Sequence, residues 1–594
     1  MKNRTLFHLL LLSAIVVLTA VAHYSIYYGA LIRGYETGFM TAFRNVALIG
    51  LLAILPIPIR YFLRYQGNWT MYTACVLLFS IGLTVQYRLF SDREYVADIP
   101  AAERAKVESA NLTDREKRSQ MLKLKLQAIA RERDAKIRTV QMRYIKENYS
   151  PEKKQMMGLP PTPAEPVDLS QETFRPAGGT LSGVALSGNT LIPIFAIFLM
   201  VLAFLAMRRE DTLTFLKNNG FLIVLLTLLP LLFAAITSRA GKSVGNMTPW
   251  EPAKIPFLIG FAALLAALYR NLSRTYWGIP RAKDVLPLLF MALVPFLPFF
   301  VLKDFGQMMV FGAVYITLYL IAVRRFPQRL VLIGSVVLVM SILIVGALPI
   351  NTQAKIPLLP TIASPVKRIL PDRIQQRFHL WLDGFDPPTP DTPWWKSDYD
   401  DYYEQLVKND PKFPKMLEDN PELQRSINVD AWFDILAFQP AQATFGIASG
   451  GYTGRGLGLG YPELIPVSDS DYVFAAAAEE LGLFGGLLIT LALIVFAAAG
   501  VRTARDSRDM FSRLCSIGLT AFIGFQALVN IGGITRALPM TGITLPFVSH
   551  GGFSLITSFT MLGILMAFSH RNAMDQYRDT IKPPLEGSPA NIAV

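Results

Sequence analysis

Residues 439–486, QPAQATFGIASGGYTGRGLGLGYPELIPVSDSDYVFAAAAEELGLFGG, decide how the whole chain is interpreted. They pass from a glycine-rich segment to an acidic pair, Asp469 and Asp471, which directly precedes a long apolar run. A carboxylate at the mouth of a membrane helix is costly to bury, which marks it as a candidate functional group. Structural roles are also open, because Ser470 or Asp471 can cap the next helix and glycine-rich loops are often plain turns.

The composition is typical of a polytopic membrane protein. Of the 594 residues, 52% are hydrophobic and 17% are charged, which is too apolar for a soluble protein of this size. A net charge of +13 would suit nucleic acid, but the basic residues are spread over the flanks of apolar runs and one charged arm. We therefore expect contact with an anionic membrane and no nucleic-acid partner.

About twelve apolar runs are long enough for transmembrane helices, so the expected fold class is an all-α integral membrane protein. The first run continues beyond a motif that imitates a signal-peptidase site, which favours an uncleaved anchor. The predicted spans are 6–22, 41–58, 70–90, 190–207, 221–236, 256–269, 285–302, 305–323, 330–348, 473–501, 511–531 and 553–569.

The charges of the short loops predict the orientation. Lys and Arg are concentrated in the loops that lie inside if the N-terminus is cytoplasmic. These inner residues include Arg60, Arg64, Arg208, Lys217, Arg270, Arg324, Arg508 and Arg571, whereas the short outer loops hold chiefly Arg33, Arg239, Lys242 and Arg536. Both termini are therefore expected in the cytoplasm, and Asp471 is expected on the outer face.

Three motifs share one order along the chain: ASGGYTGRGLGLG at 448–460, SDYVFAAAAEELG at 470–482 and LPMTGITLPFVSHGGFS at 538–554. Together they resemble the signature of the SEDS family (shape, elongation, division and sporulation), whose members include RodA and FtsW. Weaker matches are TPWEPAKIPF at 248–257, FVLKDFGQ at 300–307 and PDRIQQRFHLWLDGFDPP at 371–388. The resemblance covers about residues 69 to 570.

The chain departs from the family pattern at several places. Two helices precede the family core of ten, Gln307 and His550 replace the usual Thr and Tyr, and an acidic, aromatic stretch is inserted at 388–437. The expected organisation is an extra helix pair (1–66), the first core helix (67–90), an extracytoplasmic helical arm and linker (91–189), core helices 2–7 (190–349), a large extracytoplasmic loop with active-site motifs (350–471), core helices 8–10 (472–570) and a cytoplasmic tail (571–594).

The charged run at 101–148 has apolar residues at helical spacings of three and four, which predicts an amphipathic or coiled-coil arm. A solvated helix with salt-bridged faces and docking onto a partner or the membrane are both open.

The resemblance implies a peptidoglycan glycosyltransferase that polymerises lipid II, and its essential acid maps to Asp471. Inverting transfer to a sugar diphosphate needs a base, and partial burial should raise the pKa of Asp471 from its usual value near 3.9. Asp469 is the alternative base. No cofactor or metal is expected, and the family partner is a class B penicillin-binding protein.

Several further residues are candidates for substrate binding. Arginine grips phosphate oxygens well, so outer arginines in family-like passages could hold the diphosphate or could be surface charges. Glycines could admit sugar or phosphate close to the backbone, or form a plain turn. Glu251 and Lys254, three residues apart on one helix face, could bind substrate or form a structural ion pair. The candidates are Arg377, Arg455, Arg536, Gly450, Gly451, Lys254 and Glu251.

Glu479 and Glu480 fall inside the apolar run and are expected to face the bundle interior, either in structural pairing or in catalysis. A lipid II flippase and a non-catalytic scaffold remain alternative functions, and the motifs do not distinguish elongation from division.

Overall fold

The computed structural model shows a nearly all-helical chain. It describes residues 2–32, 39–91, 105–107, 109, 188–227, 231, 250–272, 275–276, 279–280, 305–323, 329, 372–384, 386–409, 414 and 421–581. The predicted spans at 285–302 and 330–348, part of 221–236, nearly all of the charged arm and the linker after it lie outside the described residues.

Most of the predicted apolar runs lie within helices, several of which extend beyond the predicted bounds. In the first half of the chain they are α1 (Lys2–Ile32), α2 (Phe39–Ile54), α3 (Pro56–Tyr61), α4 (Thr70–Ser91), α9 (Gly188–Met207), α10 (Glu210–Asn218), α12 (Trp250–Leu272), the antiparallel strands β1 (Thr275–Tyr276) and β2 (Ile279–Pro280), and α15 (Phe305–Ala322). In the second half they are α19 (Asp372–Leu382), α20 (Pro393–Asn409), α22 (Pro421–Trp432), the π-helical η2 (Phe433–Ala437), α23 (Phe438–Gly450), the 3-10 turn η3 (Pro462–Leu464), α24 (Val473–Asp506), α25 (Met510–Ile534) and α26 (Gly552–Ile581).

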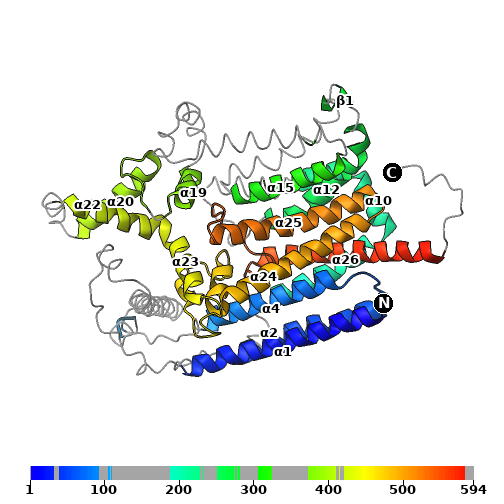
Figure 1. The fold of residues 1–594 in the computed structure, drawn as a ribbon, viewed down its shortest axis with the longest axis horizontal. Helices are drawn as coiled ribbons and strands as arrows, with labels where there is room; N and C mark the ends of the chain where they lie inside the picture. Colours follow the sequence, from blue (N-terminus) through cyan, green and yellow to red (C-terminus); the bar gives the residue numbers. More distant parts are fainter. Residues whose placement is uncertain are drawn as a thin grey trace.

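The long helices run side by side as one bundle (Figure 1). Helix α24 packs on α4 and α25, α25 also packs on α12 and α15, and α9 packs on α26. In the part of the chain that the structure describes, eight helices are long and apolar enough to cross a membrane. The expectation of an α-helical membrane protein is therefore confirmed, whereas the number twelve stays a prediction.

The loops that the charge pattern assigns to the inner side gather at one end of the bundle. Arg571 forms an ion pair with Glu210 at 3.0 Å, and Lys217 forms one with Asp509 at 3.2 Å. Helices α19, α20, α22 and α23 lie at the opposite end (Figure 1). Loops far apart in sequence thus share an end, as the predicted alternation of spans requires.

The N-terminal helix pair packs against α4 through polar side chains on its inner face. Thr19 and Ser80 hydroxyls lie 2.6 Å apart, and the ring of His23 stacks on Tyr87 with centroids 4.9 Å apart. Further along α1, Ile26 forms a small apolar cluster with Tyr87 and Leu457. The N-terminal helices are therefore packed into the bundle rather than tethered beside it.

The helical backbone of α24 is interrupted at Gly482, which has φ 68° and ψ −165°. An opened helix leaves carbonyl and N–H groups without partners inside a bundle, where water cannot reach them. Four backbone hydrogen bonds between α24 and the glycine-rich loop, residues 451–460, satisfy them. Arg455 N donates to Glu479 O (2.9 Å) and Gly456 N to Glu480 O (3.0 Å), while Leu483 N donates to Gly451 O (2.9 Å) and Phe484 N to Tyr452 O (3.3 Å). The loop is thus a structural complement of the break in α24.

Substitution of Gly482 by Ala should therefore destabilise the protein. Its backbone conformation is almost restricted to glycine, at a cost of roughly 1–3 kcal/mol for other residues, and an added Cβ would clash with the backbone N of Gly454. We expect a lower Tm in detergent for Gly482→Ala. The matched control is Gly524→Ala on α25, where an added Cβ meets nothing within 4 Å; equal Tm values for the two variants would contradict this account.

Candidate active site

Asp471 lies two residues before α24 and does not cap it. The N-cap of α24 is Tyr472, and no side-chain cap bond is made there. The half-buried carboxylate of Asp471 instead accepts a hydrogen bond from the Ser470 hydroxyl at 3.0 Å. Burial raises the pKa of Asp471 above its usual 3.8, while the Ser470 hydroxyl and the Arg377 guanidinium lower it and Asp469 raises it further.

The segment around Asp471 is fixed by hydrogen bonds to the irregular stretch between α25 and α26, residues 536–551, here called the 536–551 loop. Asn530 on α25 donates both to the carbonyl of Asp471 (2.8 Å) and to that of Ile543 (2.5 Å). The Ser549 hydroxyl donates to the Ser470 carbonyl at 2.6 Å. The irregular, largely buried backbone agrees with the prolines and glycines of LPMTGITLPFVSHGG.

Arg377 reaches the same place from α19. Its Nη1 donates to the carbonyl of Thr541 at 3.1 Å. A Cβ built on Gly542, which has φ +70°, would lie 3.3 Å from Asp471 Oδ2 and 3.9 Å from Arg377 Nη2. The absence of a side chain at Gly542 therefore leaves room for the acid and the guanidinium to approach one another.

Arg536 belongs to the same region, whereas Arg455 contacts a different part of the chain. The indole N–H of Trp381 on α19 donates to the Arg536 carbonyl at 3.1 Å. Arg455, in the glycine-rich loop, donates from Nε to the Ser449 carbonyl near the end of α23 at 3.2 Å. Gly450, the last residue of α23, and Gly451, which follows it, have their backbone against the interrupted part of α24. The structure thus brings Asp471, Arg377 and the 536–551 loop together.

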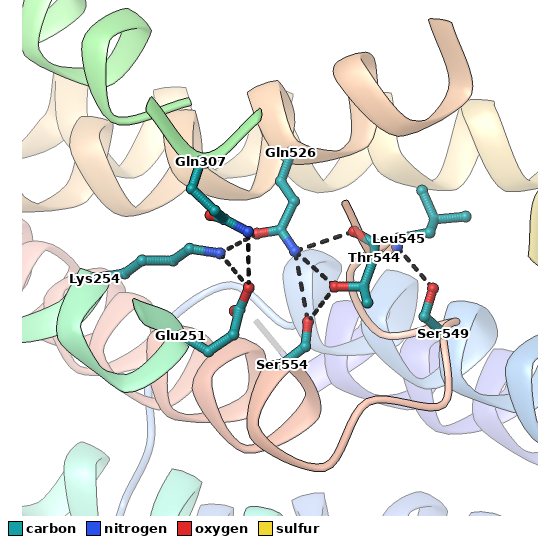
Figure 2. A network of polar contacts seen from close by, with 8 residues as sticks. All are labelled: Glu251, Lys254, Gln307, Gln526, Thr544, Leu545, Ser549 and Ser554. Atoms are coloured by element: carbon teal, nitrogen blue, oxygen red, sulfur yellow. Dashed lines mark hydrogen bonds and ion pairs between the residues drawn. The ribbon is translucent and has the colours of Figure 1, made fainter. Parts of the chain in front are cut away.

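Glu251 and Lys254 lie inside the bundle, paired with each other (Figure 2). Their charged atoms are 2.7 Å apart, and the relative exposures of the two residues are 4% and 0%. Lys254 Nζ also donates to Gln526 on α25 at 2.8 Å, and Gln307 Nε2 donates to Glu251 at 3.4 Å. Gln307 thus joins the network around this ion pair.

The network continues from Gln526 into the 536–551 loop. The Gln526 amide donates to the backbone carbonyl of Thr544 at 3.0 Å and lies 3.2 Å from the Thr544 hydroxyl and 3.5 Å from the Ser554 hydroxyl (Figure 2). A further bond runs from Leu545 N to Ser549 Oγ at 2.7 Å. The ion pair is therefore linked through one amide to the loop that holds Asp471.

Glu479 and Glu480 face the interior, as the sequence predicts. Glu480 pairs with Arg88 on α4 at 2.9 Å, and both side chains are at most 4% exposed. Glu479 accepts a hydrogen bond from the backbone N of Tyr461 at 2.9 Å. Both acids therefore have structural partners.

Sequence reasoning missed Arg88, Gln526, Asn530 and Ser549. A signal for two of them is present, because Gln526 and Asn530 are amides four residues apart in an apolar helix and so share one face. Polar residues in such positions usually bind across helices. Among the described residues, no group of three or more His, Cys, Asp and Glu residues could hold a metal ion.

Comparison with known proteins gives consistent matches. A family model described as "Cell cycle protein" (FtsW, RodA, SpoVE) matches residues 428–574. "Peptidoglycan glycosyltransferase RodA" of Mycobacterium tuberculosis (strain ATCC 25618 / H37Rv) is 27% identical over 397 residues, which cover 64% of this chain and 69% of that protein. "Stage V sporulation protein E" of Bacillus subtilis (strain 168) is 37% identical over 145 residues, which cover 24% of this chain and 40% of that protein.

Among solved structures, "Structural coordination of polymerization and crosslinking by a peptidoglycan synthase complex" matches with 20% identity and a TM-score of 0.41, covering 66% of this chain and 93% of that one. This superposition is too loose to carry an argument, so the assignment rests on sequence. The family model spans Asp471, Asn530 and the whole 536–551 loop. These matches show that the chain is similar to the FtsW, RodA and SpoVE proteins, and the family model covers residues 428–574 of it.

Proposed function

We propose that this chain is a peptidoglycan glycosyltransferase that polymerises lipid II into glycan strands on the outer face of the cytoplasmic membrane. Relatives across the family carry that activity in their names, among them RodA of Mycobacterium tuberculosis and FtsW of Geobacter metallireducens. The observation that best supports the reaction here is the half-buried Asp471 beside Arg377, at the start of an apolar helix.

Asp471 is the proposed general base. Inverting transfer forms a bond between a sugar hydroxyl oxygen of one substrate and the anomeric carbon of another, and breaks the bond from that carbon to the diphosphate. The hydroxyl proton must pass to a base, and a carboxylate whose pKa is raised by burial is a better acceptor than a free Asp. Asp469, whose backbone carbonyl accepts a hydrogen bond from His550 N, is the alternative base.

Arg377 and Arg536 are the proposed cations for the leaving diphosphate. A guanidinium offers several N–H donors in a plane that fits phosphate oxygens. Arg377 is the stronger candidate because it lies next to the proposed base. For Arg455, Gly450 and Gly451, the contacts with α24 favour support of the helix break over direct binding.

We further propose that the active site faces the extracytoplasmic side, that both termini are cytoplasmic, and that a class B penicillin-binding protein is the partner. The gathering of basic inner loops at the end of the bundle opposite α19 supports this orientation. The partner follows from the family resemblance. Elongation and division are both compatible with the residues of the site.

The first test is polymerisation of labelled lipid II by the purified protein, with and without its transpeptidase partner. Wild type should make glycan strands. Asp471→Asn should make none while keeping its Tm, because the neutral amide has nearly the same shape and removes the cost of burying a charge.

Three outcomes would redirect the proposal. Polymer from Asp471→Asn at the wild-type rate would remove Asp471 as the base. A wild-type protein that moves lipid II from one leaflet of a vesicle membrane to the other, without polymerising it, would be a flippase. A protein that only assembles with its partner would be a scaffold.

The pH dependence tests the role of Arg377. A base must be ionised, so kcat/KM falls as the pH decreases through the pKa of Asp471, which burial places above 3.8. Since the charge of Arg377 lowers that pKa, Arg377→Gln should move the acid limb of the profile to higher pH. Arg455→Gln is the control for loss of a loop arginine and should leave the limb in place; equal shifts for both variants would argue against a specific effect.

Paired substitutions distinguish the two roles of Glu251 and Lys254. Lys254→Met should lower stability by about 3–5 kcal/mol, because it leaves Glu251 buried without its cationic partner. The double variant Glu251→Gln/Lys254→Met should recover most of the Tm. If the pair only supports the fold, polymerisation should recover with it. A double variant with wild-type Tm and no activity would instead indicate contact with substrate.

A further inference from the structure

The stretch at 388–437, which has no counterpart in the family pattern, contains an apolar core of its own. This core lies at the end of the bundle where α19 is found. Helices α20 and α22 and the segment η2, within residues 386–437, form what is here called the aromatic module. Its core contains the fully buried indoles of Trp395 and Trp432. The Asn428 side chain on α22 links that helix to α20 and to the segment before α20. Its Oδ1 accepts a hydrogen bond from Trp395 Nε1 at 2.9 Å, and its Nδ2 donates one to the Pro388 carbonyl at 2.8 Å. The module is therefore a packed unit rather than an extended loop.

Helix α19 presents one face to this module. Gln376 donates to the Trp394 carbonyl at 3.4 Å, and Leu380 packs on the aromatic core. His379 lies between them, with its ring centroid 5.5 Å from that of Trp394 and 5.3 Å from that of Trp432. Positions 376, 379 and 380 lie three and four apart and so line one side of the helix.

Both ring nitrogens of His379 have partners, so the orientation of its ring is fixed. Nδ1 lies 3.0 Å from Oδ2 of Asp383, the residue that directly follows α19. Nε2 lies 3.1 Å from the carbonyl oxygen of Asp386, at the start of the module. His379 thus joins α19 to the module by polar contacts as well as by ring packing.

The other face of α19 carries the site. Arg377 and Trp381, four residues apart, bond to the Thr541 and Arg536 carbonyls of the 536–551 loop. Helix α19 is therefore held between the aromatic module and the loop that fixes Asp471. A short amphipathic helix of 11 residues has little stability alone and takes its position from such packing.

We propose that the aromatic module holds α19 in register with the 536–551 loop, and that His379 is a positioning residue that keeps the Arg377 guanidinium beside Asp471. This inference rests on the proposed function, because it assigns the insertion a task in that same site. His379 acts through Arg377 and contacts neither of the proposed reacting groups directly.

The experiment has two parts, both on the full-length protein. Amide hydrogen exchange should rise in residues 372–382 when His379 is changed to Ala, because the helix loses its contacts with the module. The control is Glu404→Ala on the exposed side of α20, where Glu404 pairs only loosely with Lys408 at 3.6 Å and 69% exposure. It should leave exchange in α19 unchanged.

The second part is a double-mutant cycle in lipid II polymerisation. His379→Ala should lower kcat by up to about a hundredfold, the loss expected when a group of the site is misplaced by about 1 Å. It should also shift the acid limb of the profile in the same direction as Arg377→Gln. Added to Arg377→Gln, it should have little further effect, because both changes act on one interaction. His379→Gln, which keeps a donor near Asp383, should recover part of the rate. If His379→Ala folds poorly, Trp394→Ala provides a second test. It removes only the ring packing and should cause the same loss of kcat.

Different results separate the two proposals. Unchanged exchange in α19, or losses that simply multiply in the double variant, would overturn the role of His379. Hydrogen exchange is measured without catalysis. It therefore tests whether the aromatic module holds α19 in place even if wild type makes no polymer. Absence of polymer from wild type would count against the proposed function itself.

Discussion

The two hydrogen bonds from the Asn530 amide, to the carbonyls of Asp471 and Ile543, are the interaction on which the site depends. One side chain on α25 fixes both the start of α24 and the irregular loop that follows α25. In a bundle interior no water can replace such a donor, so the amide holds two backbones that have no regular secondary structure of their own. The placement of the acid is thus set from a neighbouring helix rather than by its own.

The same arrangement recurs deeper in the bundle. Gln526, one turn before Asn530, reaches the loop at Thr544 and also accepts from Lys254, whose partner is Glu251. A buried charge pair is stable only when its remaining hydrogen-bonding capacity is satisfied, and the amide of Gln526 contributes to that. One polar network therefore connects α12, α25 and the 536–551 loop. It links the motif that contains Glu251 and Lys254 to the motif that contains Thr544 through Gln526, which belongs to neither motif.

Local spacing predicted part of this arrangement, and tertiary packing decided the rest. The Glu251–Lys254 pair and the inward position of Glu480 follow from helical geometry and the cost of charge in an apolar environment. The partners Gln526 and Arg88 could not be predicted, since they lie 272 and 392 residues away in sequence. The glycine-rich loop was expected to approach a ligand or to form a turn. Its hydrogen bonds to α24 depend on a helix break at Gly482 that the apolar pattern conceals.

The two N-terminal helices limit where other proteins can bind. Helices α1 and α2 cover one flank of α4, and the cluster of Ile26, Tyr87 and Leu457 joins α1 to the glycine-rich loop. A membrane helix from another protein cannot pack on that flank while the pair is in place. Any companion with its own membrane anchor must therefore approach this chain from another side of the bundle, so the N-terminal pair would influence the geometry of any such assembly.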